Sequence, residues 1–151
     1  MNPAFLKLDE KQVMGLTIYG EARGEPIEGK IAVGTVILER VDHRDWDGTT
    51  VKEVCLKRRQ FSCYNEFDKE YGKMLHIAEN WDASIATDFC LMNCYTVAVG
   101  LLSGKIPRDP VLSKAHVCQY LNPKWAEPTR EAWIKSGMKV VATIKNHEFF
   151  A

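Results

Sequence analysis

Two apolar stripes at helical spacing flank one short polar segment, and this arrangement most limits how the chain can fold. The first stripe predicts a helix over residues 8–19 and consists of Leu6, Val13, Met14, Leu16 and Ile18. The second predicts a buried helix ending near residue 40 and consists of Ile27, Ile31, Val33, Val36, Ile37 and Val41. Between them, residues 19–26 read Tyr-Gly-Glu-Ala-Arg-Gly-Glu-Pro. We expect Gly20 to end the first helix and Pro26 to lie in the first turn of the second.

The remaining segments predict more helix and little strand. Thr50 and Glu53 form a capping box that predicts a short helix, and residues 67–81 predict another. Residues 85–102 are the most apolar segment, but Asp88 interrupts it, which favours a buried central helix over a membrane span. Residues 117–120 and 140–144 predict short extended segments. The expected fold is mainly α (α+β) with a buried central helix and minor β content, which is consistent with a lysozyme-like domain.

Length and composition exclude several classes of protein. The 151 residues fit one domain, so residues 1–151 are expected to form a single unit. Because the formal net charge is zero, a nucleic-acid binder is disfavoured. The five cysteines are odd in number and lack a Cys-x-x-Cys pair, so they are interpreted as core residues. The four histidines show no His-x-x-x-His spacing, and we expect no metal and no cofactor.

Glu21 is the strongest candidate for a catalytic group. It follows an apolar helix, and both partial burial and the negative end of the helix dipole would raise its pKa. A carboxyl group with a raised pKa can deliver a proton to a leaving oxygen, as cleavage of a glycosidic bond requires. Glu25 is a possible second carboxylate, although its position at the start of the next helix also favours a structural role. Arg23, between them, could pair with either carboxylate or contact a substrate.

The sequence resembles the SleB-type cell wall hydrolases, a family named after spore cortex-lytic enzymes. The similar residues are Tyr19 to Pro26, Glu28-Gly29, the apolar run to Arg40-Val41, Gln60-Phe61-Ser62, Tyr120, Asn122-Pro123, Trp125, Ile144, Asn146-His147 and Phe149. The chain departs from the pattern at Lys145, where the family usually has glycine, and at Gln119, which replaces a frequent second aromatic residue.

The resemblance implies cleavage of peptidoglycan between N-acetylmuramic acid and N-acetylglucosamine. Residues 1–151 are then expected to be a single catalytic domain, without a separate wall-binding module. It places the catalytic glutamate on Glu21 and implies substrate-binding roles for Gln60, Phe61, Ser62, Tyr120, Asn122 and His147. A lytic transglycosylase with Glu21 as general acid and base is the first hypothesis. A hydrolytic muramidase would add a second carboxylate from Glu25, Asp45 or Asp47. A non-catalytic wall-binding module is a further alternative.

The expected setting is a bacteriophage endolysin. Residues 1–8 lack the basic and apolar regions of a signal peptide. We therefore expect a monomer that stays in the cytoplasm of the host bacterium until a holin opens the membrane, and then reaches the periplasm and cell wall. Glycan strands of peptidoglycan are its expected partner, with no nucleic acid and no membrane span.

Overall fold

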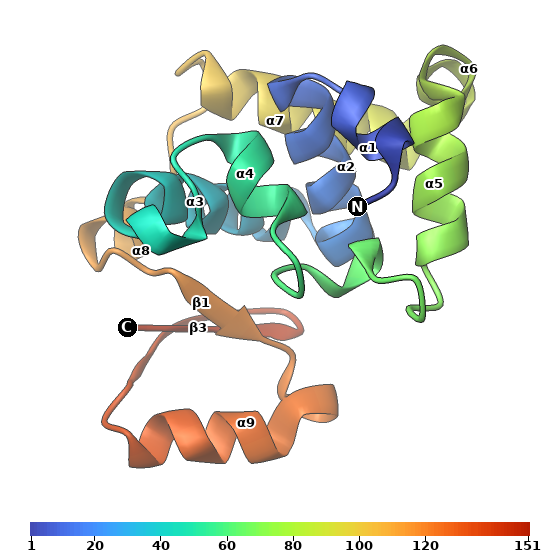
Figure 1. The fold of residues 1–151 in the computed structure, drawn as a ribbon. Coiled ribbons are helices and arrows are strands. Elements are labelled where there is room, and N and C mark those ends of the chain that lie inside the picture. Colours follow the sequence, from blue (N-terminus) through green and yellow to red (C-terminus); the bar gives the residue numbers. More distant parts are fainter.

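The computed structural model describes residues 1–151, most of which lie in helices (Figure 1). The helices are α1 (Pro3–Lys7), α2 (Glu10–Ala22), α3 (Ile27–His43), α4 (Val51–Leu56), α5 (Tyr71–Glu79), α6 (Trp81–Thr87), α7 (Phe89–Leu102), α8 (Pro110–Lys114) and α9 (Pro123–Lys135). Two short 3-10 helices are η1 (Asp45–Asp47) and η2 (Ser62–Tyr64), and the strands are β1 (Gln119–Leu121), β2 (Val140–Ile144) and β3 (His147–Phe150). The predicted class, mainly helical with a small sheet, is confirmed.

Helix α2 lies at the centre of the helical body and packs against α3, α4 and α7. Asp9 and Gln12 form a capping box at its start, and every residue from Val13 to Tyr19 is buried. Helix α7 packs along it so closely that a Cβ added at Gly15 would lie 2.9 Å from Cα of Tyr95. The central position therefore belongs to α2. The prediction that residues 85–102 form this central helix was wrong, because one face of α7 is exposed at Phe89 and Met92.

Several predicted helix ends were also wrong. Helix α2 continues through Gly20, which serves close packing: a Cβ there would lie 2.7 Å from Sγ of Cys63. Pro26 is the N-cap of α3 and lies one residue before its first turn. The helix predicted over residues 67–81 begins only at Tyr71, and Phe67 is fully exposed.

The apolar segment around α7 is divided into two helices. Asp88 caps α7, since its Oδ1 accepts a hydrogen bond of 3.0 Å from the backbone N–H of Leu91. The axes of α6 and α7 meet at 106° across this break. Neither helix alone has the length and apolar character needed to cross a membrane, although the bent pair together would meet the composition requirement.

The three antiparallel strands have the order β1-β3-β2 and lie between the helical body and α9 (Figure 1). Strands β1 and β2 agree with the predicted extended segments, whereas β3 and α9 were not predicted. Phe149 packs toward the helical body in a small apolar cluster with residues of α3 and α8. Phe150 contacts Trp133 of α9, with ring centroids 5.2 Å apart, and Arg130 of α9 pairs with Glu148 at 2.6 Å. Strand β3 therefore joins α9 to the rest of the domain.

Candidate active site

Glu21 lies in the last turn of α2, half-buried at the junction of the helices and the sheet. The hydroxyl of Tyr120, on β1, donates a 2.9 Å hydrogen bond to its Oε2. The Tyr120 ring packs against Phe149 and His147 of β3, with centroid separations of 5.5 and 5.1 Å. One oxygen of the carboxylate is therefore held in place by a rigid aromatic residue from the sheet.

Opposing electrostatic effects act on Glu21. Burial raises the pKa of its carboxyl group and is the largest influence. The hydrogen bond from Tyr120, the nearby charge of Arg40 and a contact with the Cys63 thiol lower that pKa, while the charge of Asp68 raises it further. The net direction is upward, so more of the carboxyl group stays protonated at a given pH than in solvent. This is the state that a general acid needs.

Two hollows meet at Glu21 and form one groove across the molecule. The first has a volume of about 430 Å³ and is lined by Glu21, Arg40, Arg59, Gln60, Phe61, Ser62, Tyr120, Leu121, Asn122, Trp125 and His147. The second has a volume of about 410 Å³ and is lined by Gly20, Glu21, Arg23, Gly24, Ser62, Cys63, Asp68, Lys69, Glu70 and Trp125. Both hollows share Glu21, Ser62 and Trp125. A chain-like ligand lying in this groove would pass directly over the glutamate.

The structure brings together the six residues predicted to bind substrate: Gln60, Phe61, Ser62, Tyr120, Asn122 and His147 all line the first hollow. Asn122 also has a structural task, because its Oδ1 accepts a hydrogen bond of 3.0 Å from the backbone N–H of Lys124 at the start of α9. Trp125 projects from the same turn with 76% of its surface exposed and is available to stack on a ligand.

Arg40 is a cleft residue whose role the sequence did not indicate. It is buried on α3, its Nε donates a 2.7 Å hydrogen bond to the carbonyl of Cys118, and its guanidinium lies 5.1 Å from the centre of the Phe61 ring. When the Gln60 amide is oriented with its oxygen toward Arg40, that oxygen accepts hydrogen bonds from the guanidinium. No carboxylate pairs directly with this arginine within 4 Å. The positive charge of Arg40 therefore lies at the groove without a paired carboxylate, and it lowers the pKa of Glu21.

Glu25 does not line either hollow, which weakens its case as a second carboxylate. Its side chain is buried, and its Oε1 accepts a 2.8 Å hydrogen bond from the amide of Asn146 in the turn between β2 and β3. Lys145, in the same turn, has a φ of 49° and donates a 2.8 Å hydrogen bond to the carbonyl of Gly24. A left-handed backbone favours glycine, which explains why the family usually has glycine at the position of Lys145. Glu25 thus anchors the hairpin turn.

The other proposed second carboxylates also lie outside the groove. Asp47 is buried and forms ion pairs with Arg44 and Lys57 at 2.9 and 3.1 Å, and Asp45 is exposed on η1. Only Asp68 and Glu70 share the groove with Glu21, and Glu70 is paired with Arg23 at 2.8 Å. Asp68 is therefore the one additional carboxylate in the groove without an ion pair.

The neighbouring thiol is a poor nucleophile. Burial raises the pKa of Cys63 well above its ordinary value, and the charge of Glu21 raises it further. All five cysteines are free, and only Cys90 is exposed. The thiols of Cys55, Cys63 and Cys94 contribute to the core as small apolar groups.

A mainly helical body, a small sheet and a half-buried acid in a groove define a lysozyme-like domain. A family model described as Cell Wall Hydrolase matches residues 24–150, and the chain belongs to that family. The match begins at Gly24, so Glu21 lies just before it.

Two curated relatives are similar over part of the chain. A spore cortex-lytic enzyme of Oceanobacillus iheyensis is 36% identical over 80 residues, which is 48% of this chain and 29% of that protein. A spore cortex-lytic enzyme of Halalkalibacterium halodurans is 48% identical over 40 residues, 26% of this chain and 12% of that protein. The chain therefore aligns with less than one third of the length of either relative.

Two solved structures share the fold. The catalytic domain of the germination-specific lytic transglycosylase SleB from Bacillus anthracis has a TM-score of 0.59 and 24% identity, covering 94% of this chain and 93% of that one. The catalytic domain of the Bacillus cereus SleB protein has a TM-score of 0.59 and 25% identity, covering 94% and 89%. The predicted lysozyme-like fold is confirmed by these likenesses.

Proposed function

We propose that this protein cleaves the glycan strands of peptidoglycan between N-acetylmuramic acid and N-acetylglucosamine, with Glu21 as the catalytic acid. The observation that carries the proposal is the position of Glu21: a carboxyl group with a raised pKa, held by Tyr120, at the point where two hollows meet. Membership of the cell wall hydrolase family supports this substrate.

The proposed reaction is that of a lytic transglycosylase. Because Oε2 of Glu21 accepts the hydrogen bond from the Tyr120 hydroxyl, the acidic proton belongs on Oε1. It passes to the glycosidic oxygen as the bond from that oxygen to the muramic C1 breaks. The carboxylate then takes the proton of the muramic C6 hydroxyl, whose oxygen bonds to C1. One carboxylate acts as acid and then as base, and the product ends in a 1,6-anhydro ring without added water.

The transglycosylase proposal is supported by the scarcity of carboxylates beside Glu21 and by the structural relative from Bacillus anthracis, which is a lytic transglycosylase. A hydrolytic muramidase is the second candidate, because Asp68 lies in the same groove. In that reaction Asp68 would activate a water molecule or stabilise the developing positive charge on the sugar.

Product analysis separates the two reactions. Purified peptidoglycan is digested in water enriched in ¹⁸O, and the fragments are examined by mass spectrometry. A transglycosylase gives anhydromuramic ends without ¹⁸O, whereas a muramidase gives reducing ends that carry it. Asp68→Asn is the matched variant, and it should retain most activity if Glu21 acts alone. Reducing, labelled ends would overturn the transglycosylase proposal, and intact glycan with well-folded wild-type protein would overturn the function itself.

We also propose that this cell wall hydrolase acts as a bacteriophage endolysin. In this proposal a monomer waits in the host cytoplasm, and a holin gives it access to the periplasm and cell wall. Expression in a bacterial host tests this: cells should lyse only when a membrane-permeabilising protein is produced as well. Lysis without that protein would contradict the endolysin proposal. Tight binding to cell walls without any cleavage would instead favour the wall-binding module.

A further inference from the structure

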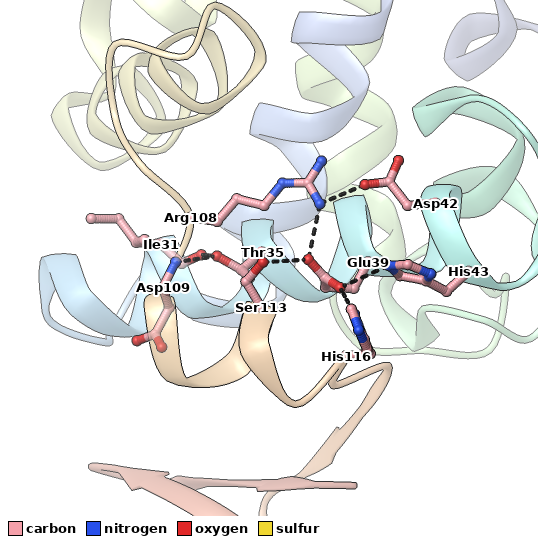
Figure 2. A network of polar contacts seen from close by, with 9 residues as sticks. All are labelled: Ile31, Thr35, Glu39, Asp42, His43, Arg108, Asp109, Ser113 and His116. Atoms are coloured by element: carbon pink, nitrogen blue, oxygen red, sulfur yellow. Dashed lines mark hydrogen bonds and ion pairs between the residues drawn. The ribbon is translucent and has the colours of Figure 1, made fainter.

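Three potential metal ligands converge on the outer side of α3, around residues that have no place in the proposed reaction (Figure 2). Glu39 and His43 lie one helical turn apart on α3, and His116 follows α8. The carboxylate of Glu39 is almost fully buried, while the side chains of His43 and His116 are 43% and 62% exposed. One potential ligand atom from each residue lies within 4.8 Å of the other two.

Two of the three separations between ligand atoms fit a tetrahedral ion. Oε2 of Glu39 lies 3.4 Å from Nε2 of His43 and 3.2 Å from Nδ1 of His116. Zinc bonds to nitrogen and oxygen are about 2.0–2.1 Å long, so neighbouring ligands of a tetrahedral ion are about 3.3–3.4 Å apart. The 3.4 Å contact also exceeds an ordinary hydrogen bond. The two imidazole rings face the same carboxylate oxygen, with centroids 4.2 Å apart (Figure 2).

The other oxygen of Glu39 is held by residues that would orient the ligand. Oε1 accepts hydrogen bonds of 2.9 Å from both Nη1 of Arg108 and Oγ of Ser113. This leaves Oε2 for an ion, and partners that fix a ligand in this way are typical of metal sites. Arg108 also pairs with Asp42 at 2.6 Å, so two carboxylates face one guanidinium. With both imidazoles neutral the cluster carries a net negative charge, which favours a cation.

The backbone conformation of His116 places its side chain beside Glu39. Its φ of 50° lies in the left-handed region, which is uncommon for a residue other than glycine. That conformation follows the end of α8 and directs the imidazole toward Glu39 (Figure 2). Two residues later, the carbonyl of Cys118 accepts the hydrogen bond from Arg40. An ion bound by Glu39, His43 and His116 would therefore link α3 to the segment that leads into β1.

We propose that Glu39, His43 and His116 bind one divalent transition-metal ion of the zinc class, with water as the fourth ligand on the exposed side. Two imidazoles and one carboxylate form a known zinc ligand set. The sequence contains a signal for part of this site, the Glu-x-x-x-His spacing of Glu39 and His43. The prediction of no metal rested on histidine pairs and did not consider a carboxylate with a histidine.

Titration of the chelator-treated, full-length protein with Zn²⁺ tests the proposal, and Co²⁺ serves as a spectroscopic probe. We expect one ion per chain and an absorption band typical of tetrahedral Co²⁺. His43→Gln and His116→Asn should each weaken binding at least about 10- to 100-fold. Asparagine suits position 116 because it tolerates the left-handed backbone. At a Zn²⁺ concentration 100 times the dissociation constant, the wild-type Tm should rise by about 5–10 °C.

The control variant is His76→Gln, which removes a histidine on α5 far from this cluster and should leave the affinity unchanged. Circular dichroism verifies that each variant is folded before titration. Binding that is equally tight in a His43→Gln/His116→Asn double variant would overturn the proposal, because the ion would then sit on other groups such as the exposed thiol of Cys90. Absence of saturable binding by the folded wild type would overturn it as well.

Discussion

Replacement of Glu21 by glutamine should remove the activity and stabilise the fold at the same time. The amide keeps the shape of the side chain, and its oxygen can still accept the hydrogen bond from Tyr120. It cannot donate the proton that the glycosidic oxygen needs. Loss of a general acid costs about 10²- to 10⁴-fold in rate, and we expect a decrease in kcat of this size.

The stabilisation follows from the raised pKa of Glu21, whose main cause is burial. Between the unfolded pKa of about 4.3 and the higher folded pKa, the folded protein binds more protons than the unfolded one. Stability therefore falls as pH rises through that range, and the cost is fully present above the folded pKa. Each unit of upward shift costs about 1.4 kcal/mol. Glutamine has no such cost, so we expect Glu21→Gln to have a higher Tm than the wild type at neutral pH.

Calorimetry at about pH 7.5 and about pH 3 measures both limits of this linkage. The gain in Tm should be present at the higher pH and vanish at the lower, where Glu21 is protonated in both states. Glu131→Gln, an exposed change on α9, is the matched control and should alter neither activity nor the pH dependence. A folded Glu21→Gln protein with activity within tenfold of wild type, or with a lower Tm at about pH 7.5, would refute the reasoning.

Three further variants test the surroundings of the acid. Tyr120→Phe removes a hydrogen bond to a charged group, so kcat should fall about 10- to 100-fold. The pH at which activity declines should move upward, because that bond lowers the pKa of Glu21; a pH–rate profile measures both effects. Glu25→Gln keeps the acceptor for the hairpin turn, and kinetic assays should find activity within about threefold. Gly20→Ala should cost about 1–3 kcal/mol in urea unfolding, since the new methyl group would meet Sγ of Cys63.

Sequence periodicity predicted the parts of the fold whose apolar residues recur regularly. The helices around α2 and α3 and the extended segments at β1 and β2 have such patterns, and the structure contains all four. Helix α9 was missed because its polar sequence contains Pro128 and a kink at Ala126. Helix ends were misjudged where glycine serves packing, as at Gly20, since a sequence does not reveal which side chain will lie against it.

The candidate site was predictable to the extent that a specific motif marks it. Glu21 stood out because it follows an apolar helix within an unusual run of charged residues. The bond from Tyr120 joins residues 99 positions apart, and only the folded chain places them together. Arg40 and Asp68 were missed for the same reason: each lies in an ordinary polar position of its own segment, and its relation to Glu21 depends on tertiary packing.

The pairing of β1 with β3 has a consequence for when the protein can become active. Tyr120 reaches Glu21 from β1, and β1 pairs only with β3, through Tyr120 opposite Phe149. Residues 147–150 follow every other element of the groove in the sequence. During synthesis, the acid on α2 is therefore made early but gains its partner only after these residues have emerged and paired. Tyr120 can therefore hold Glu21 in this way only in a chain that has been synthesised through β3.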